Sequence, residues 1–208
     1  MSPRGRGEAR DVVAVILAAG ASRRFGAGDK RLARLPTGQP LLAAAVANAA
    51  AAFSRLRVVI RDGDDPAVLG LAADTPVIRA PHAHDGLGAS LADAFATLGN
   101  APDLVDSVAA AVLLADMPSL SPETLGQLQA HATRARIVRP RQGGRPGHPV
   151  LFGRDFWGEL SALHGDEGAR GVIARHRAHS LELEVDDPGI HLDIDVVEDL
   201  TALRPRQS

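Results

Sequence analysis

The chain of 208 residues contains no cysteine, has almost balanced charge and lacks any long apolar run. The absence of cysteine excludes disulfides, cysteine zinc sites, thiol nucleophiles and cysteine-bound iron–sulfur clusters. This composition is compatible with a reducing compartment, and we expect a cytoplasmic protein.

The chain has no excess of charge of either sign. Lysine and arginine number 23 against 25 aspartates and glutamates, which gives a net charge of −2 and argues against nucleic acid as the main partner. The longest weakly polar run, residues 41–53, is alanine-rich and too short to cross a bilayer, so we expect no membrane partner. The apolar run after Asp11 leads into two arginines, which predicts no targeting segment.

Length and composition indicate one domain. Hydrophobic residues make up 45% of the chain, enough for a substantial core in 208 residues. We predict a single domain over residues 11–203, with flexible tails at 1–10 and 204–208. The stretch of about 140–180 is rich in glycine, proline and arginine at its start, and we predict that it is a small insertion that binds a substrate.

Apolar runs and helix-favouring segments alternate along the chain. Continuous apolar runs predict buried parallel strands, and this alternation predicts an α/β, Rossmann-like three-layer αβα fold with a mostly parallel sheet. The predicted strands are 12–17, 57–60, 76–78, 107–115, 137–138, 150–152 and 180–185, the predicted helices are 41–53, 90–98, 121–131, 155–163 and 168–175, and residues 191–200 are expected to form a short strand entering a terminal helix.

The strand predicted at Val12–Leu17 leads into a loop with Gly20, Ser22, Arg24 and Lys30. Glycines let backbone N–H groups turn toward an anion, and the cations offset its charge, so this pattern favours a polyphosphate. A core strand followed by a solvated basic turn is the alternative. The spacing fits neither a Walker loop nor the dinucleotide-binding fingerprint.

Two aspartates are candidates for metal binding. Asp116 ends the most apolar predicted strand, beside the predicted phosphate loop, where Mg²⁺ prefers a few carboxylate oxygens together with substrate phosphates. A turn or capping aspartate is the alternative, but Ser121 is a better helix cap. Asp193 and Asp195 alternate along the segment LDID, so one of them is expected to face inward.

Several motifs resemble the nucleotidyltransferases that handle the molybdenum cofactor. LAAGASRRFG with Lys30 is similar to their opening signature, although Phe25 stands where that family usually has methionine. DIDVVEDL is similar to their closing motif, with Val196 and Val197 replacing threonine and proline. The segments GHPVLF and GDEGAR, at 147–152 and 165–170, resemble the molybdenum cofactor cytidylyltransferase branch.

The resemblance implies site residues and a cofactor. It implies that Asp116 and Asp195 hold Mg²⁺, and that Arg24 and Lys30 offset the charge of the leaving phosphates. Arg145, His148 and Arg170 are expected to receive an anionic acceptor. The nucleotide-binding residues that it implies are Leu17, Ala18, Ala19, Gly20, Ser22, Arg24, Lys30, Asp85, Gly86 and Ser90.

The resulting hypothesis is the transfer of CMP from CTP to the phosphate of molybdopterin or its molybdenum form, with release of pyrophosphate. Ala19 matches the cytidylyl branch, because the guanylyl branch tends to have glycine there. Three alternatives stay open: a GTP-using guanylyltransferase, a sugar-phosphate or polyol-phosphate nucleotidyltransferase, and a noncatalytic chaperone that binds the nucleotide or cofactor. A molybdoenzyme or its chaperone is a further possible partner.

Overall fold

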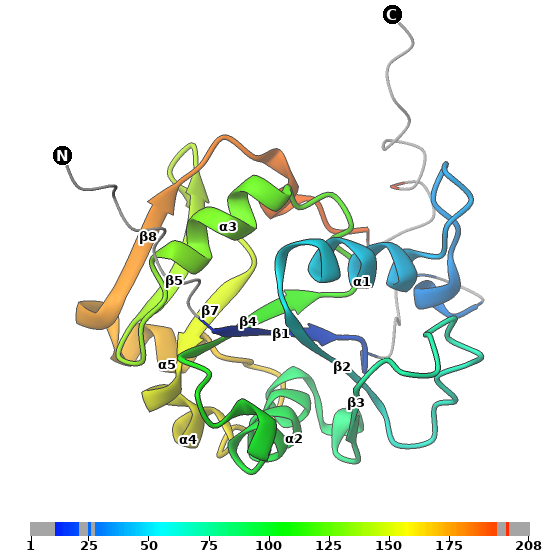
Figure 1. Cartoon of the computed structure of the whole chain (residues 1–208), viewed down its shortest axis with the longest axis horizontal. Coiled ribbons are helices and arrows are strands. Elements are labelled where there is room, and N and C mark those ends of the chain that lie inside the picture. Colours follow the sequence, from blue (N-terminus) through cyan, green and yellow to red (C-terminus); the bar gives the residue numbers. More distant parts are fainter. Residues whose placement is uncertain (1–10, 21–24, 26–27, 195–198, 200–208) are drawn as a thin grey trace, which may run out of the picture.

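An eight-stranded mixed sheet forms the centre of the computed structural model, which describes residues 11–20, 25, 28–194 and 199 (Figure 1). The strands lie in the order β3-β2-β1-β4-β7-β5-β6, and β8 pairs with β5. Their bounds are β1 Val12–Leu17, β2 Arg55–Arg61, β3 Val77–Ala80, β4 Ala109–Leu114, β5 Ile137–Gln142, β6 Arg145–Pro146, β7 Val150–Gly153 and β8 Ser180–Glu184.

Helices cover both faces of the sheet, which confirms the predicted α/β, Rossmann-like three-layer fold. In Figure 1, α1 and α3 lie on one side of the strands and α2, α4 and α5 on the other. The described residues place a further short helical turn at Lys30–Leu32, between β1 and α1. The helices are α1 Leu41–Ala52, α2 Leu87–Gly99, α3 Pro122–Ala130, α4 Trp157–Leu160 and α5 Arg170–Arg175.

Strand β1 is the central strand, and every one of its residues is buried. It pairs in parallel with β2 on one side and with β4 on the other. Its side chains alternate between the two cores, because Ala14 and Ile16 pack toward α1 and α3 while Val13 and Val15 pack toward α2 and α4. The carboxyl ends of β1 and β4 therefore meet at one edge of the sheet.

The second half of the chain extends the same sheet. Strand β7 runs antiparallel to both β4 and β5, and β8 runs parallel to β5. Residues 140–180, predicted as an insertion, contribute β6, β7 and the end of β5 to this sheet and α4 and α5 to its covering layer. No helix in the described residues is both long enough and apolar enough to cross a membrane.

Some predicted elements differ from the structure. Helix α2 begins at Leu87, three residues before the predicted start, directly after Gly86 with its positive φ of 119°. Strand β5 continues to Gln142 rather than ending at Val138. Residues 192–194 form no strand, which corrects the prediction for LDID, and the predicted helix at 155–163 is reduced to a helical turn and the four residues of α4. The predicted tails lie outside the described residues, as does nearly all of the predicted terminal helix.

Candidate active site at the carboxyl ends of the central strands

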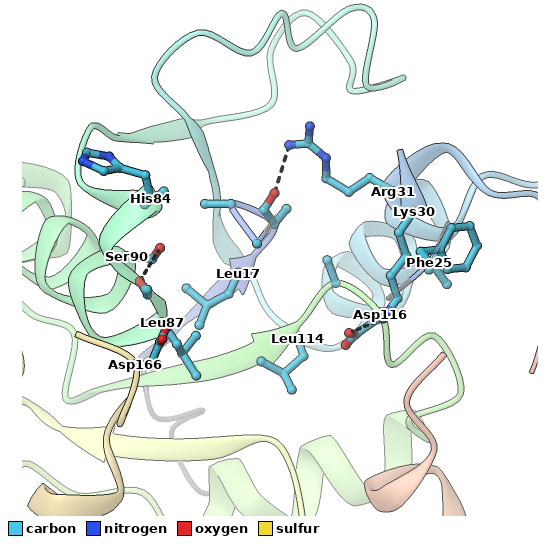
Figure 2. A pocket seen from close by; sticks show the side chains of 17 residues that line it. Leu17, Phe25, Lys30, Arg31, His84, Leu87, Ser90, Leu114, Asp116 and Asp166 are labelled. Atoms are coloured by element: carbon cyan, nitrogen blue, oxygen red, sulfur yellow. Dashed lines mark hydrogen bonds and ion pairs between the residues drawn. The ribbon is translucent and has the colours of Figure 1, made fainter. Parts of the chain in front are cut away.

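A cavity of about 600 Å³ opens where β1 and β4 end (Figure 2). Ligands in parallel α/β sheets bind at this edge, and the volume suits a small-molecule ligand. The start of α2 forms one wall, and the Lys30–Leu32 turn forms the opposite wall. The cavity is lined by Leu17, Ala18, Ala19, Gly20, Phe25, Lys30, Arg31, Leu41, Ala83, His84, Gly86, Leu87, Ser90, Leu114, Ala115, Asp116 and Asp166.

An ion pair between Lys30 and Asp116 spans the right-hand side of the cavity in Figure 2. Lys30 Nζ donates to Asp116 Oδ2 at 2.8 Å, and only 9% of the lysine side chain is exposed. The other carboxylate oxygen, Asp116 Oδ1, is buried and has no hydrogen-bond partner among the described residues. An unpaired buried carboxylate oxygen is costly, so this atom is suited to binding a cation or a donor from a ligand.

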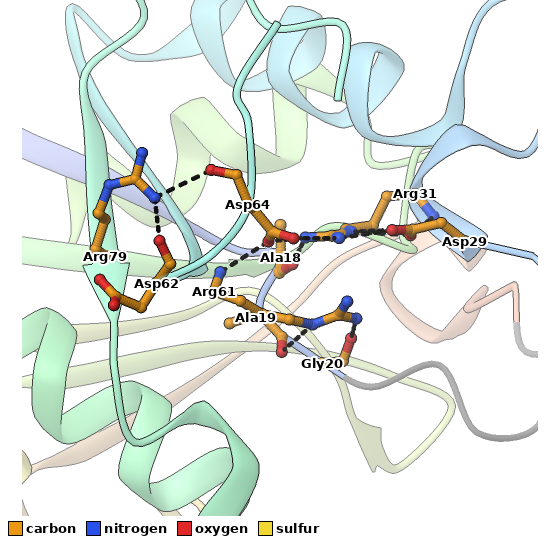
Figure 3. Close-up of polar contacts among 9 residues, drawn as sticks. All are labelled: Ala18, Ala19, Gly20, Asp29, Arg31, Arg61, Asp62, Asp64 and Arg79. Atoms are coloured by element: carbon orange, nitrogen blue, oxygen red, sulfur yellow. Dashed lines mark hydrogen bonds and ion pairs between the residues drawn. The ribbon is translucent and has the colours of Figure 1, made fainter. Parts of the chain in front are cut away.

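Two arginines donate hydrogen bonds to the backbone carbonyls that follow β1 (Figure 3). Arg31 Nη1 donates to the carbonyl of Ala18 at 2.9 Å, and Arg61 donates to the carbonyls of Ala19 and Gly20. These carbonyls are thereby occupied by guanidinium donors, which fixes the backbone at the end of β1. The small side chains of Ala18 and Ala19 are buried, whereas Gly20 is exposed at the cavity edge.

Arg31 is itself buried between two carboxylates. Its guanidinium donates to Asp29 and to Asp64, with Nη2 lying 2.9 Å from Asp64 Oδ1. Burial works to lower the pKa of Arg31, but the hydrogen bonds to Asp64 and Asp29 outweigh it and raise the pKa. The hydrogen bond from Arg31 lowers the pKa of Asp29 below its ordinary value. The cluster therefore stays fully ionised and fixes the segment that carries Lys30.

The start of α2 is packed against a second loop. Gly88 N donates to Gly165 O at 2.7 Å, and a Cβ at Gly88 would lie 2.7 Å from the carbonyl oxygens of His164 and Gly165. A Cβ at Gly86 would lie 2.1 Å from Asp166 Oδ1. Glycine at both positions permits this close approach, which brings Asp166 into the cavity wall.

The structure brings together many of the residues predicted to bind the nucleotide. Asp85 is an exception, since it is exposed and does not line the cavity. Its Oδ1 lies 3.3 Å from His84 Nε2. Ser22, Arg24 and Asp195 lie outside the described residues. The predicted residues that line the cavity are Leu17, Ala18, Ala19, Gly20, Lys30, Gly86, Ser90 and Asp116.

The residues predicted to bind the acceptor are not in the cavity wall. Arg145 and Arg170 are both exposed, and His148 is partly buried, two residues before β7. The pKa of His148 is lowered, mainly by burial. The charges of Arg170 and Arg139 lower it further, whereas those of Asp116 and Asp193 oppose the shift. The charges that act on His148 thus include those of Asp116 and Arg170.

The segment 187–194 connects His148 with the end of β4. His148 N donates to Ile190 O at 3.0 Å, and four residues later Ile194 N donates to Asp116 O, also at 3.0 Å. The Ile194 side chain is buried against Phe25 and Leu41. The chain therefore reaches Asp116 directly before the undescribed Asp195.

Several lining residues are not predicted from the sequence. His84, Leu87 and Asp166 depend on how two distant loops pack together, and the sequence alone carries no signal for that contact. Arg31 stands in the sequence as one of several basic loop residues. Its burial depends on Asp64, 33 positions later in the chain.

Comparisons with known proteins identify relatives of this chain. The family model described as "MobA-like NTP transferase domain" matches residues 14–180. The solved homologue of Rv0371c from Mycobacterium sp. strain JC1 is 30% identical, with a TM-score of 0.78 over 93% of this chain and 96% of that one. Rv0371c from Mycobacterium tuberculosis H37Rv, solved in complex with manganese, is 26% identical, with a TM-score of 0.72 over 94% and 98% of the two chains.

A curated relative is longer than this chain. The bifunctional protein GlmU of Gluconacetobacter diazotrophicus is 30% identical over 155 residues, which are 68% of this chain and 31% of that protein. The match therefore covers less than a third of the length of that relative.

Proposed function

The chain belongs to the family of MobA-like NTP transferase domains and is a nucleotidyltransferase, and from this premise we propose that it transfers CMP from CTP to the phosphate of molybdopterin or its molybdenum form. Pyrophosphate is the second product. The observation that carries the proposal is the Lys30–Asp116 ion pair beside the small residues that end β1, all lining one cavity. A cation and a carboxylate at this edge are suited to a nucleoside triphosphate and its metal ion.

The residues at the end of β4 fit a divalent metal ion. Asp116 Oδ1 is buried without a partner in the described part of the chain, and such a carboxylate oxygen is a suitable ligand for a hard cation. Mg²⁺ is usually bound by one or two carboxylates together with substrate phosphates. We propose that Asp116 and Asp195 hold Mg²⁺. When bound, the ion would neutralise charge on the triphosphate.

The chain's own residues position the reactants. A phosphate nucleophile is already ionised near neutral pH, so the reaction requires no strong general base, and catalysis rests on alignment and charge neutralisation. Lys30 is held in place by Asp116 and by the Arg31 cluster beside it, so its ammonium group is preorganised at the cavity wall. We propose that Lys30 and Arg24 offset the charge that develops on the departing pyrophosphate.

The choice of CTP over GTP rests on Ala19. Its side chain is 3% exposed and lines the cavity, so its methyl group takes space beside the base. A pyrimidine needs less room than a purine, although a difference of one methyl group is worth only about 1 to 3 kcal/mol. Ser90, at the start of α2, lines the cavity and donates its hydroxyl hydrogen to Gly86 O, and its hydroxyl oxygen is proposed to accept a hydrogen bond from the nucleotide.

Release of pyrophosphate tests the proposal. It is measured with CTP and with GTP, in the presence of Mg²⁺, with and without molybdopterin. We expect release that depends on molybdopterin and is faster with CTP. Equal use of both nucleotides would contradict the argument from Ala19, and release that is independent of molybdopterin would remove it as the acceptor.

A matched variant sharpens the nucleotide test. Ala19→Gly removes the methyl group, so the ratio of kcat/KM for CTP to that for GTP should fall by about 5- to 100-fold. Ala44→Gly, in α1, is the control for loss of a methyl group at a buried position away from the cavity. An unchanged ratio in Ala19→Gly would show that this side chain does not select the base.

A further inference from the structure

Unpaired buried polar atoms gather near one hairpin. Within the described residues, four buried side-chain polar atoms have no hydrogen-bond partner. Three of them belong to β5 and to the loop before β7, namely Arg139 Nε, Arg141 Nε and His148 Nδ1, and the fourth is Asp116 Oδ1. Such atoms are commonly satisfied by water, an ion or a ligand. The hairpin is therefore a place where a polar ligand would complete the hydrogen bonding.

The two arginines lie on one face of β5. Ile137, in the same strand, packs toward α2 and α4, and Arg139 and Arg141 follow at intervals of two residues. Gly147 N donates to Pro140 O at 2.9 Å, which sets His148 beside Arg139 in the hairpin. Arg139, Arg141 and His148, together with Arg170, whose charge also acts on His148, are called the arginine patch below.

The patch adjoins the cavity. The antiparallel pairing of β4 and β7 ends at Val112 and Val150. Beyond this pair, at the same end of the two strands, lie Leu114, two residues after Val112, and His148, two residues before Val150. Leu114 lines the cavity, so His148 stands next to its wall. A ligand on the arginine patch therefore has the cavity, and the nucleotide proposed to occupy it, as its neighbour.

One carboxylate partly balances the patch. Glu182, on the neighbouring β8, contacts both arginines, with Arg141 Nη1 lying 3.3 Å from Glu182 Oε2. A guanidinium has five N–H donors, so a single carboxylate leaves most of them available. The side chains of Arg139 and Arg141 are 25% and 43% exposed, and a ligand can reach them from solvent. Forked guanidinium groups suit phosphate oxygens.

We propose that Arg139 and Arg141 bind the phosphate group of the acceptor and direct it toward the cavity beside His148. The proposal rests on the proposed function in one respect, namely that the acceptor is a phosphate monoester. Glu182 occupies the arginines when no phosphate is bound and competes with it. The patch thus supplies a second anion site, separate from the residues proposed to bind the triphosphate.

Inorganic phosphate is the probe for this site. Calorimetric titration is carried out with the cavity filled by the α,β-methylene analogue of the nucleotide that the protein binds, so that phosphate cannot occupy the triphosphate site. We expect Arg139→Gln and Arg141→Gln each to weaken phosphate binding by about tenfold or more, because each loses a charge-assisted contact. Arg136→Gln, which removes the same charge just before β5, is the control and should leave binding unchanged.

Glu182→Gln gives a prediction of the opposite sign. Removing the competing carboxylate should strengthen phosphate binding severalfold, whereas a purely structural role for the cluster predicts weaker binding or none in every variant. Unaltered phosphate affinity in both arginine variants would overturn the proposal, as would weaker binding in Glu182→Gln. The titration needs no molybdopterin, so it distinguishes failure of this site from failure of the proposed acceptor.

Discussion

Replacing the buried Arg31 should destabilise the protein strongly. Only 5% of its side chain is exposed, and its guanidinium donates hydrogen bonds to Asp29, Asp64 and the carbonyl of Ala18. In Arg31→Met the volume is largely kept, but both carboxylates lose their partner. Breaking a buried ion pair costs about 3 to 5 kcal/mol. Because Asp29 and Asp64 are 26% and 14% exposed and retain some hydration, we expect the lower end of that range.

Thermal unfolding measures this effect. For a chain of this length a loss of about 3 kcal/mol corresponds to a fall in Tm of about 6 to 12 °C. Arg34→Met is the control, since Arg34 is exposed and should change stability by no more than about 0.5 kcal/mol. A fall in Tm for Arg31→Met that matches the control would refute the structural role of the cluster.

The pH dependence provides a second check on the same cluster. The pKa values of Asp29 and Asp64 are held below their ordinary values, the first mainly by the Arg31 hydrogen bond and the second by hydrogen bonds that outweigh its burial. Their contribution to stability is therefore full above the unfolded pKa of about 4 and is lost as the pH falls below it. The difference in Tm between the native protein and Arg31→Met should shrink below about pH 4. A difference that stays constant down to about pH 2 would contradict the assignment.

Three further predictions concern the site and its supports. Asp116→Asn should lower turnover by about 100- to 1,000-fold, with much less change in the nucleotide Kd, because the lost carboxylate charge acts on the reacting phosphates; unchanged kcat would remove Asp116 from the metal site. Gly88→Ala should cost about 1 to 3 kcal/mol in urea unfolding, because the methyl group meets the 164–165 backbone, whereas Gly99→Ala on the same helix meets nothing within 4 Å and should be neutral or stabilising. Ser121→Ala should cost about 1 kcal/mol, since Ser121 Oγ accepts from Thr124 N at 3.1 Å at the start of α3, and no loss would argue against this cap.

The strands most accurately predicted from sequence are those buried on both faces. The predicted bounds of β1 agree with the structure, because an uninterrupted apolar run bounded by polar residues is typical of a strand covered on both sides. Strand β5 is longer than predicted, because Arg139 to Gln142 carries little apolar pattern. Its pairing is supplied by β8, about 40 residues further along the chain, and no local signal reveals such a partner.

Some site residues are likewise predictable from the local sequence, whereas others depend on tertiary contacts. Gly20, Lys30 and Asp116 are predicted from their places after apolar strands, and parallel topology brings those places to one edge. Asp166 enters the cavity wall only because two glycines let its loop pack on α2, which is a tertiary contact. The prediction for Asp85 from its loop motif is not matched by the cavity lining, because its side chain is directed to solvent.

Transfer of CMP to molybdopterin is tested by following the α-phosphate of the nucleotide. CTP that is radiolabelled at the α-phosphate is incubated with the protein, Mg²⁺ and molybdopterin, and the products are separated. We expect the label to move to molybdopterin in step with pyrophosphate release, and this transfer to be lost in Asp116→Asn. Label recovered only as free CMP, or no transfer at all with an intact and folded protein, would contradict it.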